Sequence, residues 1–206
     1  MNPSSPRLEP WIRTHLQPRL KEDGFAGSGR TFRKVSNGII QVLNVQGSRY
    51  GGQFAINLGL QPALIADISG KSPDLNKISD TECEFRRRLS ENGADQWWNH
   101  DSSEEGIDSA VAAAAEVYVR VGRPLFERLG GPNSSFFSIT PDQMPQFREI
   151  FGGFGSTDTR IALVLARLRA AEGRSSEAQA FANFGLLRVG PAVALRQELE
   201  RLCRTQ

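Results

Sequence analysis

The chain has 206 residues, of which 39% are hydrophobic, so it is long enough and apolar enough to bury a core without disulfides or a structural metal. Its 25 Lys and Arg residues nearly balance its 23 Asp and Glu residues, which gives a net charge of +2. This balance argues against a protein dedicated to binding nucleic acid or membrane surfaces.

Localisation is predicted from what the chain lacks. No apolar run approaches the roughly 20 residues of a membrane span, and the amino-terminal residues do not have the charged-then-apolar pattern of a signal peptide. The two cysteines, Cys83 and Cys203, form no disulfide framework and have no metal-ligand spacing. We therefore expect a cytoplasmic protein without a membrane segment.

The first elements are a helix and a hairpin. Residues 8–22 carry apolar side chains at intervals of three and four, which predicts an amphipathic helix. Pro18 lies inside it and removes a backbone donor, so we expect a kink or break there. Alternating segments at about 30–36 and 39–46 are separated by Asn37 and Gly38, which tolerate the positive φ angles of a type I′ turn. The pattern predicts a β-hairpin.

Two further strands are predicted at 53–60 and 81–89, because apolar and polar residues alternate in both segments. In the last of these the odd-numbered side chains, Cys83 among them, are expected to be buried, and the even-numbered ones to form a charged ladder on the opposite face. The connection at 61–80 is longer than most loops in compact domains. We expect it to be functional or mobile.

The second half of the chain is predicted to be helical. Ser102 and Glu105 have the spacing of a capping box and begin a long helix that ends near residue 130. Residues 166–181 resemble one helical hairpin of the tetratricopeptide type. Because such repeats need about three copies to bury a core alone, this hairpin is expected to dock on the rest of the protein or on a partner.

The predicted fold class is therefore α+β. An amino-terminal helix packs on a roughly four-stranded antiparallel sheet, and an all-α carboxyl-terminal half follows. We divide the chain into an α+β domain at residues 1–131, which includes the long helix, and a helical appendage at residues 132–206 that packs on it.

Motifs for metals, cofactors and catalysis are weak. The only histidines, His15 and His100, are too few for a His-rich metal site, and neither has a second His or Cys at ligand spacing. Lys71 and Ser72 follow a glycine as in a phosphate-binding loop, but the first glycine of that motif is missing. We predict no metal, no cofactor and no catalytic residues.

Two groups of side chains are candidates for binding. Amides on predicted strands cost stability unless they are hydrogen-bonded, and arginine and tryptophan are enriched in interface hot spots and anion sites. The alternative is structural: amides on a solvated sheet face, a salt ladder, and tryptophan filling the core. The candidate binding residues are Asn44, Gln46, Asn57, Arg86, Arg88, Trp97 and Trp98.

The ordered series GRTFRK, IIQVLNVQ, FAINLGL and ECEFRRRL, followed by WW, resembles the bacterial family known as domain of unknown function 4304. The resemblance covers about Leu8 to Trp98 and continues weakly into the helical half. It implies an α+β amino-terminal domain, and it supplies no activity and no catalytic residues. The matching positions are Phe25, Phe32, Gln41, Asn44, Gln46, Asn57, Gly59, Arg86, Arg88, Trp97 and Trp98.

Two functions from different classes fit these observations. The favoured one is a regulatory or immunity-type binding protein without catalytic activity, which meets a protein partner or a small acidic ligand through the sheet. The alternative is an enzyme that uses Glu82 or Glu84 with Arg86 and His100 in a pocket on the sheet. Nucleic acid is disfavoured because the two glutamates flank the arginines and would repel phosphates. The oligomeric state is left open by the sequence.

Overall fold

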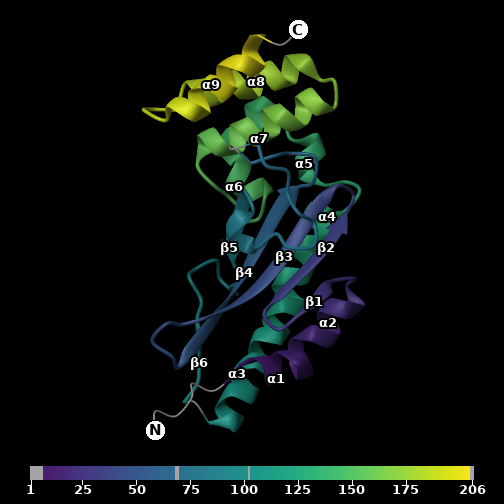
Figure 1. Ribbon diagram of the computed structural model, residues 1–206, viewed down its shortest axis with the longest axis vertical. Helices are drawn as coiled ribbons and strands as arrows, with labels where there is room; N and C mark the ends of the chain where they lie inside the picture. The colour runs from purple at the N-terminus through teal and green to yellow at the C-terminus, as the bar shows by residue number, and fades with distance from the viewer. Residues whose placement is uncertain (1–6, 68–69, 102, 205–206) are drawn as a thin grey trace.

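The computed structural model describes residues 7–67, 70–101 and 103–204 (Figure 1). An antiparallel sheet forms the middle of an elongated molecule, and the last three helices form one end. The strand order is β1-β2-β3-β4-β5, with β6 paired to β4. The strands are β1 Ala26–Ser28, β2 Thr31–Ser36, β3 Ile39–Gly47, β4 Gln53–Pro62, β5 Phe85–Arg88 and β6 Trp98–Asn99.

Helices make up most of the remaining structure, so the α+β class is confirmed. Ser103 caps the long helix by accepting from the Gly106 N–H, and the predicted cap Ser102 lies outside the described residues. The helical elements are α1 Glu9–Trp11, η1 Ile12–Leu16, α2 Gln17–Glu22, η2 Asp80–Glu82, α3 Glu104–Val117, η3 Tyr118–Gly122, α4 Arg123–Gly130, α5 Ser135–Ser138, η4 Pro141–Gln146, α6 Phe147–Ile150, α7 Asp158–Ala171, α8 Ser175–Leu186 and α9 Val193–Arg204.

The predicted hairpin is confirmed. Asn37 and Gly38 have φ angles of 48° and 75°, and they join β2 to β3 as a two-residue turn requires. The short strands β1 and β6 were not predicted, because three and two residues are too few to show an alternating pattern. The strand predicted at 81–89 is shorter than expected, since Ser79 and Glu82 form a capping box that starts a 3-10 turn before it.

The helical segments at residues 9–22 and 104–130 each widen into a π-helical turn just before a proline. The N–H of Gln17 donates to the Ile12 carbonyl, five residues back, directly before Pro18. In the same way, the N–H of Arg123 donates to the Tyr118 carbonyl directly before Pro124, the second residue of α4. Because a proline lacks the N–H and crowds the carbonyl four residues earlier, a wider turn accommodates it without breaking the helix. The kink or break expected at Pro18 is therefore a π turn.

One face of the sheet packs against the helices. Its side chains come from alternate positions of β3 and β4, including Leu43, Val45, Ile56 and Leu58, and all are at most 1% exposed. They belong to the same apolar cluster as the buried face of α3. This alternation is the period of two that the sequence shows, and it sets the register of the sheet.

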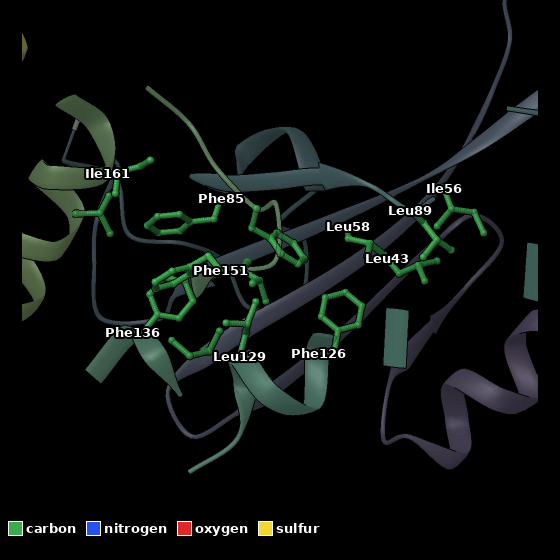
Figure 2. Packing of buried hydrophobic residues seen from close by; sticks show 14 of the residues in the cluster. Leu43, Ile56, Leu58, Phe85, Leu89, Phe126, Leu129, Phe136, Phe151 and Ile161 are labelled. Carbon is green, nitrogen blue, oxygen red and sulfur yellow. The ribbon is translucent and has the colours of Figure 1, made fainter. Parts of the chain in front are cut away.

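A cluster of aromatic rings joins the sheet to the carboxyl-terminal half (Figure 2). Phe85 of β5 meets the ring of Phe136 at a centroid distance of 4.8 Å and the ring of Phe151 at 6.0 Å. Such pairs contribute roughly 0.5–1.5 kcal/mol each beyond their buried area. The apolar cluster thus crosses the predicted boundary between residues 131 and 132, and the division into two domains stays a prediction.

The long connection after β4 covers part of the other sheet face. Ile78 and Cys83 pack against Ile40 and Val42 as a second, smaller apolar cluster. Gly59 makes this possible, because a Cβ at that position would lie 2.8 Å from the Cys83 sulfur. The thiol is buried as expected, but it faces this second cluster rather than the helices.

The helical hairpin of α7 and α8 is anchored through a buried arginine. Arg169 is fully buried and donates to the carbonyl oxygens of Phe136 and Ile139, at 3.0 and 2.9 Å. Glu172 and Glu177 lie within 3.4 Å of its guanidinium group. The hairpin therefore docks on α5 and the residue that follows it.

Replacing this arginine tests how much the anchor contributes. Arg169→Ala leaves two buried carbonyl groups without their donor and removes a large, fully buried side chain, so we expect a loss of about 3–5 kcal/mol in the free energy of unfolding. The measurement is urea unfolding followed by circular dichroism. The exposed Arg204→Ala serves as the matched control and should change stability by less than about 0.5 kcal/mol. Equal values for the two variants would contradict the anchoring role.

The seating of the connection is testable through its cysteine. Burial raises the pKa of the Cys83 thiol well above its ordinary value, so in the native protein this thiol should react with iodoacetamide more slowly than Cys203. Gly59→Ala should displace the connection and speed the labelling of Cys83 several-fold, as measured by peptide mass spectrometry. Gly47→Ala is the control, because its new methyl group would meet only the flexible end of Arg30. Unchanged labelling in Gly59→Ala would contradict this seating.

Candidate functional site

Four neighbouring strands place polar side chains in one row across the second face of the sheet. Thr31 lies opposite Asn44, Asn44 opposite Asn57, and Asn57 opposite Arg88. Since adjacent strands are about 4.8 Å apart, the row is roughly 14 Å long. It lies toward the end of β4 that pairs with β6, next to the area covered by the connection. We call this part of the sheet the open face, formed by Thr31, Asn44, Gln46, Asn57, Arg86, Arg88 and Trp97.

The amides of the open face bind one another only in part. Asn44 donates from Nδ2 to the hydroxyl of Thr31 at 2.8 Å, and Asn57 donates from Nδ2 to the Oε1 atom of Gln46 at 2.9 Å. Gln46 is exposed, while Asn44 and Asn57 are half-buried. These bonds fix the orientation of the amides. They leave the Oδ1 atoms of both asparagines without a partner among the described residues, available as acceptors.

An arginine, an aspartate and a tryptophan meet beside the amides. The guanidinium of Arg88 lies over the ring of Trp97 at 4.7 Å, and its Nε atom is 3.1 Å from Asp95. The indole N–H of Trp97 donates to the other oxygen of Asp95 at 3.1 Å. Arg86, two residues earlier on β5, has a side chain that is 49% exposed and lies 3.9 Å from the buried Asp80. The sheet therefore presents two arginines and an aromatic ring to solvent.

Trp98 is not part of the open face. It is 7% exposed and stacks on Phe54 in the main core, with ring centroids 5.7 Å apart. Successive side chains of a strand point to opposite faces, so Trp97 and Trp98 separate as soon as β6 forms. Of the seven candidate binding residues, the structure brings six together, and the structural alternative of a core-filling tryptophan describes Trp98.

A second hollow lies beneath the connection. It has a volume of about 220 Å³, and Gln61, Ile65, Glu84 and Arg160 are among its lining residues. Glu84 is buried, and both of its oxygens accept from Arg160, at 2.9 and 2.7 Å. The backbone N–H of Glu84 donates to the side chain of Gln61. The pair ties the sheet to the first turn of α7.

Comparison with known families now adds to this geometry. Residues 16–128, more than half of the chain, match the family described as a domain of unknown function (DUF4304). The chain belongs to this family. No curated protein and no solved structure has significant similarity to it. The DUF4304 match contains every residue of the open face and ends before α5, so Arg160 contributes to the second hollow from outside the matched segment.

The chemistry that the enzymatic alternative requires does not assemble in this DUF4304 protein. The backbone N–H of His100 donates to the carbonyl of Gly52, directly before β4, whereas Glu84 lies beside Gln61 at the other end of that strand. Nine residues of extended strand separate these positions by roughly 30 Å. Hydrogen bonds from Ser79 hold the pKa of Glu82 below its ordinary value, which favours the ionised form over a general acid.

The described residues contain neither a metal-binding cluster nor a membrane-spanning helix. No group of three or more His, Cys, Asp or Glu side chains is positioned to hold a metal ion. Within the same part of the chain, no helix is long and apolar enough to cross a membrane.

Sequence reasoning missed three residues of these sites in the DUF4304 protein. Thr31 has no distinctive neighbours in sequence, and only the strand register places it beside Asn44. Asp95 lies in a loop, where a short run of polar residues gives no sign of an arginine partner. Arg160 is 76 positions from Glu84, and a pairing at that separation leaves no local pattern. The one available signal was Glu84 itself, a charged residue directly before β5. A carboxylate that is buried at such a position needs a partner.

The tie between Glu84 and Arg160 is testable with a double-mutant cycle. Arg160→Gln leaves a buried carboxylate unpaired, so we expect a loss of about 3–5 kcal/mol in the free energy of unfolding at pH 7. Adding Glu84→Gln should recover part of that loss, with a coupling energy of at least about 1.5 kcal/mol.

The exposed pair of Glu200 and Arg204 provides the matched cycle. Its coupling energy is expected to be below about 0.5 kcal/mol, because solvent and salt screen an exposed pair. Urea unfolding gives all four free energies in each cycle. A coupling at the buried pair no larger than at the exposed pair would contradict the assignment of this tie.

Proposed function

We propose that this member of the family is a regulatory or immunity-type binding protein of the bacterial cytoplasm, and that its open face is the contact surface for a protein partner. One observation carries the proposal: aligned amides, two arginines and a tryptophan lie together on one sheet face, and all of these side chains are exposed or half-buried. Two free cysteines support a reducing compartment.

The shape of the open face favours a macromolecule over a small ligand. Its polar row extends across four strands, and each side chain is held by the register of the sheet rather than by a loop. Small molecules are mostly bound in concave sites that bury most of their surface, and a row that crosses four strands offers a broader contact than they need. It suits a partner surface that brings its own donors and acceptors to Asn44 and Asn57.

The charges of the open face favour a protein over nucleic acid. Arg86 and Arg88 attract carboxylates, and arginine beside tryptophan is a common composition of interface hot spots. Asp80 and Asp95 lie within 4 Å of these two arginines and would repel a continuous line of phosphates. A partner surface with separate carboxylates and amides can avoid the aspartates and still reach the arginines.

The enzymatic alternative receives less support. It requires acidic, basic and imidazole side chains in one pocket, and its members lie at opposite ends of β4. Cys83 is buried, and burial raises the pKa of its thiol, so it is unsuited to act as a nucleophile. The proposed function therefore involves recognition without catalysis.

Site-specific photocrosslinking in the native host tests the proposal. A photoreactive residue at the exposed position Gln46 should give a discrete protein adduct, and one at Glu200 on α9 should not give that adduct. Arg86→Glu should abolish the adduct at position 46, whereas Arg196→Glu on α9 should leave it unchanged. The adduct partner is then identified by mass spectrometry, purified and titrated against the same variants, and the Arg86→Glu chain should bind at least about ten-fold more weakly.

Three outcomes would contradict the proposal. They are the absence of a specific adduct at position 46, an adduct that Arg86→Glu does not affect, and an adduct that nuclease rather than protease removes. The last outcome would identify the open face as a nucleic-acid surface.

A further inference from the structure

Arginine side chains gather around one glycine-rich turn, at residues 152–155, next to the edge of the sheet. Arg87 donates through Nη1 to the carbonyl of Gly152 and lies against Gly153. A Cβ on Gly152 would lie 2.5 Å from Nη2 of Arg128, and one on Gly155 would lie 3.3 Å from Nη1 of Arg148. Three guanidinium groups from separate elements therefore surround this turn.

A hollow of about 430 Å³ opens between this turn and β5. Two of its lining residues, Arg87 and Arg88, are arginines, and most of the others are glycines and an alanine, which place backbone rather than bulky side chains around the space. Among the described residues, Asp95 is the one carboxylate that lines it. The lining residues are Arg87, Arg88, Gly93, Ala94, Asp95, Gly152 and Gly153.

Of the arginines around the hollow and the turn, only Arg88 has a carboxylate partner among the described residues, Asp95. Within the described part of the chain, no carboxylate lies within ion-pair distance of Arg87, Arg128 or Arg148. The Nη1 atom of Arg88 is buried and has no hydrogen-bond partner among those residues. A half-buried guanidinium without a counter-charge is costly, and burial accordingly lowers the pKa of Arg87. A bound anion would remove this cost.

We propose that the hollow between β5 and the turn at 152–155 binds a dianionic phosphoryl group, held by the guanidinium groups of Arg87 and Arg88, which line it. Planar guanidinium groups match the spacing of phosphate oxygens and bind them through paired hydrogen bonds. A dianion fits better than a carboxylate because three arginines near the turn lack a carboxylate partner. The concave shape suits a small molecule that bears the phosphoryl group.

This site adjoins the proposed partner surface and shares Arg88 with it, but it does not rest on the proposed function. Arg87 points to the side of the sheet opposite Arg86, and the turn lies beyond the DUF4304 match, in the carboxyl-terminal half. The hollow therefore combines the arginines of the family domain with a turn supplied by the helical half of this chain.

The test is a titration of the full chain with inorganic phosphate at constant ionic strength. Binding is measured by isothermal titration calorimetry and by the shift in the thermal unfolding temperature. We expect saturable binding and a rise in the unfolding temperature, with acetate binding at least about ten-fold more weakly, since it carries half the charge and fewer oxygens. Raising the sodium chloride concentration should weaken phosphate binding.

Two sets of variants localise the ion. Arg87→Gln should weaken phosphate binding at least about ten-fold through the loss of a charge-assisted contact. Because Arg87 also holds the turn, the double variant Arg128→Gln with Arg148→Gln removes nearby charge from exposed side chains and should weaken binding about three-fold or more. Arg49→Gln, on the distant β3–β4 hairpin, is the control and should bind as the parent chain does.

The proposal would be overturned by any of three results. These are no saturable phosphate binding by the parent chain, acetate binding as tight as phosphate binding, and equal phosphate affinity in the parent, the Arg87→Gln chain and the double variant. Loss of binding in the Arg49→Gln control would also overturn it, by showing that the ion senses only net charge.

Discussion

Burial of one sheet face beneath the helices is the constraint on which the rest of the structure depends. The segment from α3 to α4 and the amino-terminal helices cover the side chains of Leu43, Val45, Ile56 and Leu58. Among the described residues, the connection after β4 covers part of the other face, where Ile78 and Cys83 pack against Ile40 and Val42. Asn44, Gln46 and Asn57 on the same face are exposed or half-buried, and their polar character fits this incomplete cover.

Local sequence patterns predicted the parts of the structure that local chemistry decides. The Asn37-Gly38 turn sets the register of β2 on β3, and the alternation in β3 and β4 puts Asn44 and Asn57 on one face of the sheet. Long-range features had no such signal. The path of the connection over Gly59 and the pairing of Glu84 with Arg160 depend on tertiary packing between distant segments. The separation of the two adjacent tryptophans followed only once the two-residue strand β6 was known.

The arginine triplet on β5 shows how one strand can serve two surfaces. Because side chains alternate, Arg86 and Arg88 point toward the open face, while Arg87 points toward the glycine-rich turn. In the sequence the triplet reads as a single basic patch. The fold divides it: the outer two arginines each lie near an aspartate, and the middle one has no acidic partner among the described residues. The two proposed sites therefore lie on neighbouring sides of the same strand and share Arg88.

The alternation of side chains also separates the positions that form the core from the positions that face outward. Asn44 and Gln46 alternate in sequence with Leu43 and Val45, yet only Leu43 and Val45 belong to the apolar layer between the sheet and the helices. Substitutions at the outward positions leave the packed layer intact, so they change stability little. The proposed contact surface can therefore change at these positions while the packed layer stays the same. The scaffold is a constant frame for a surface that can diversify.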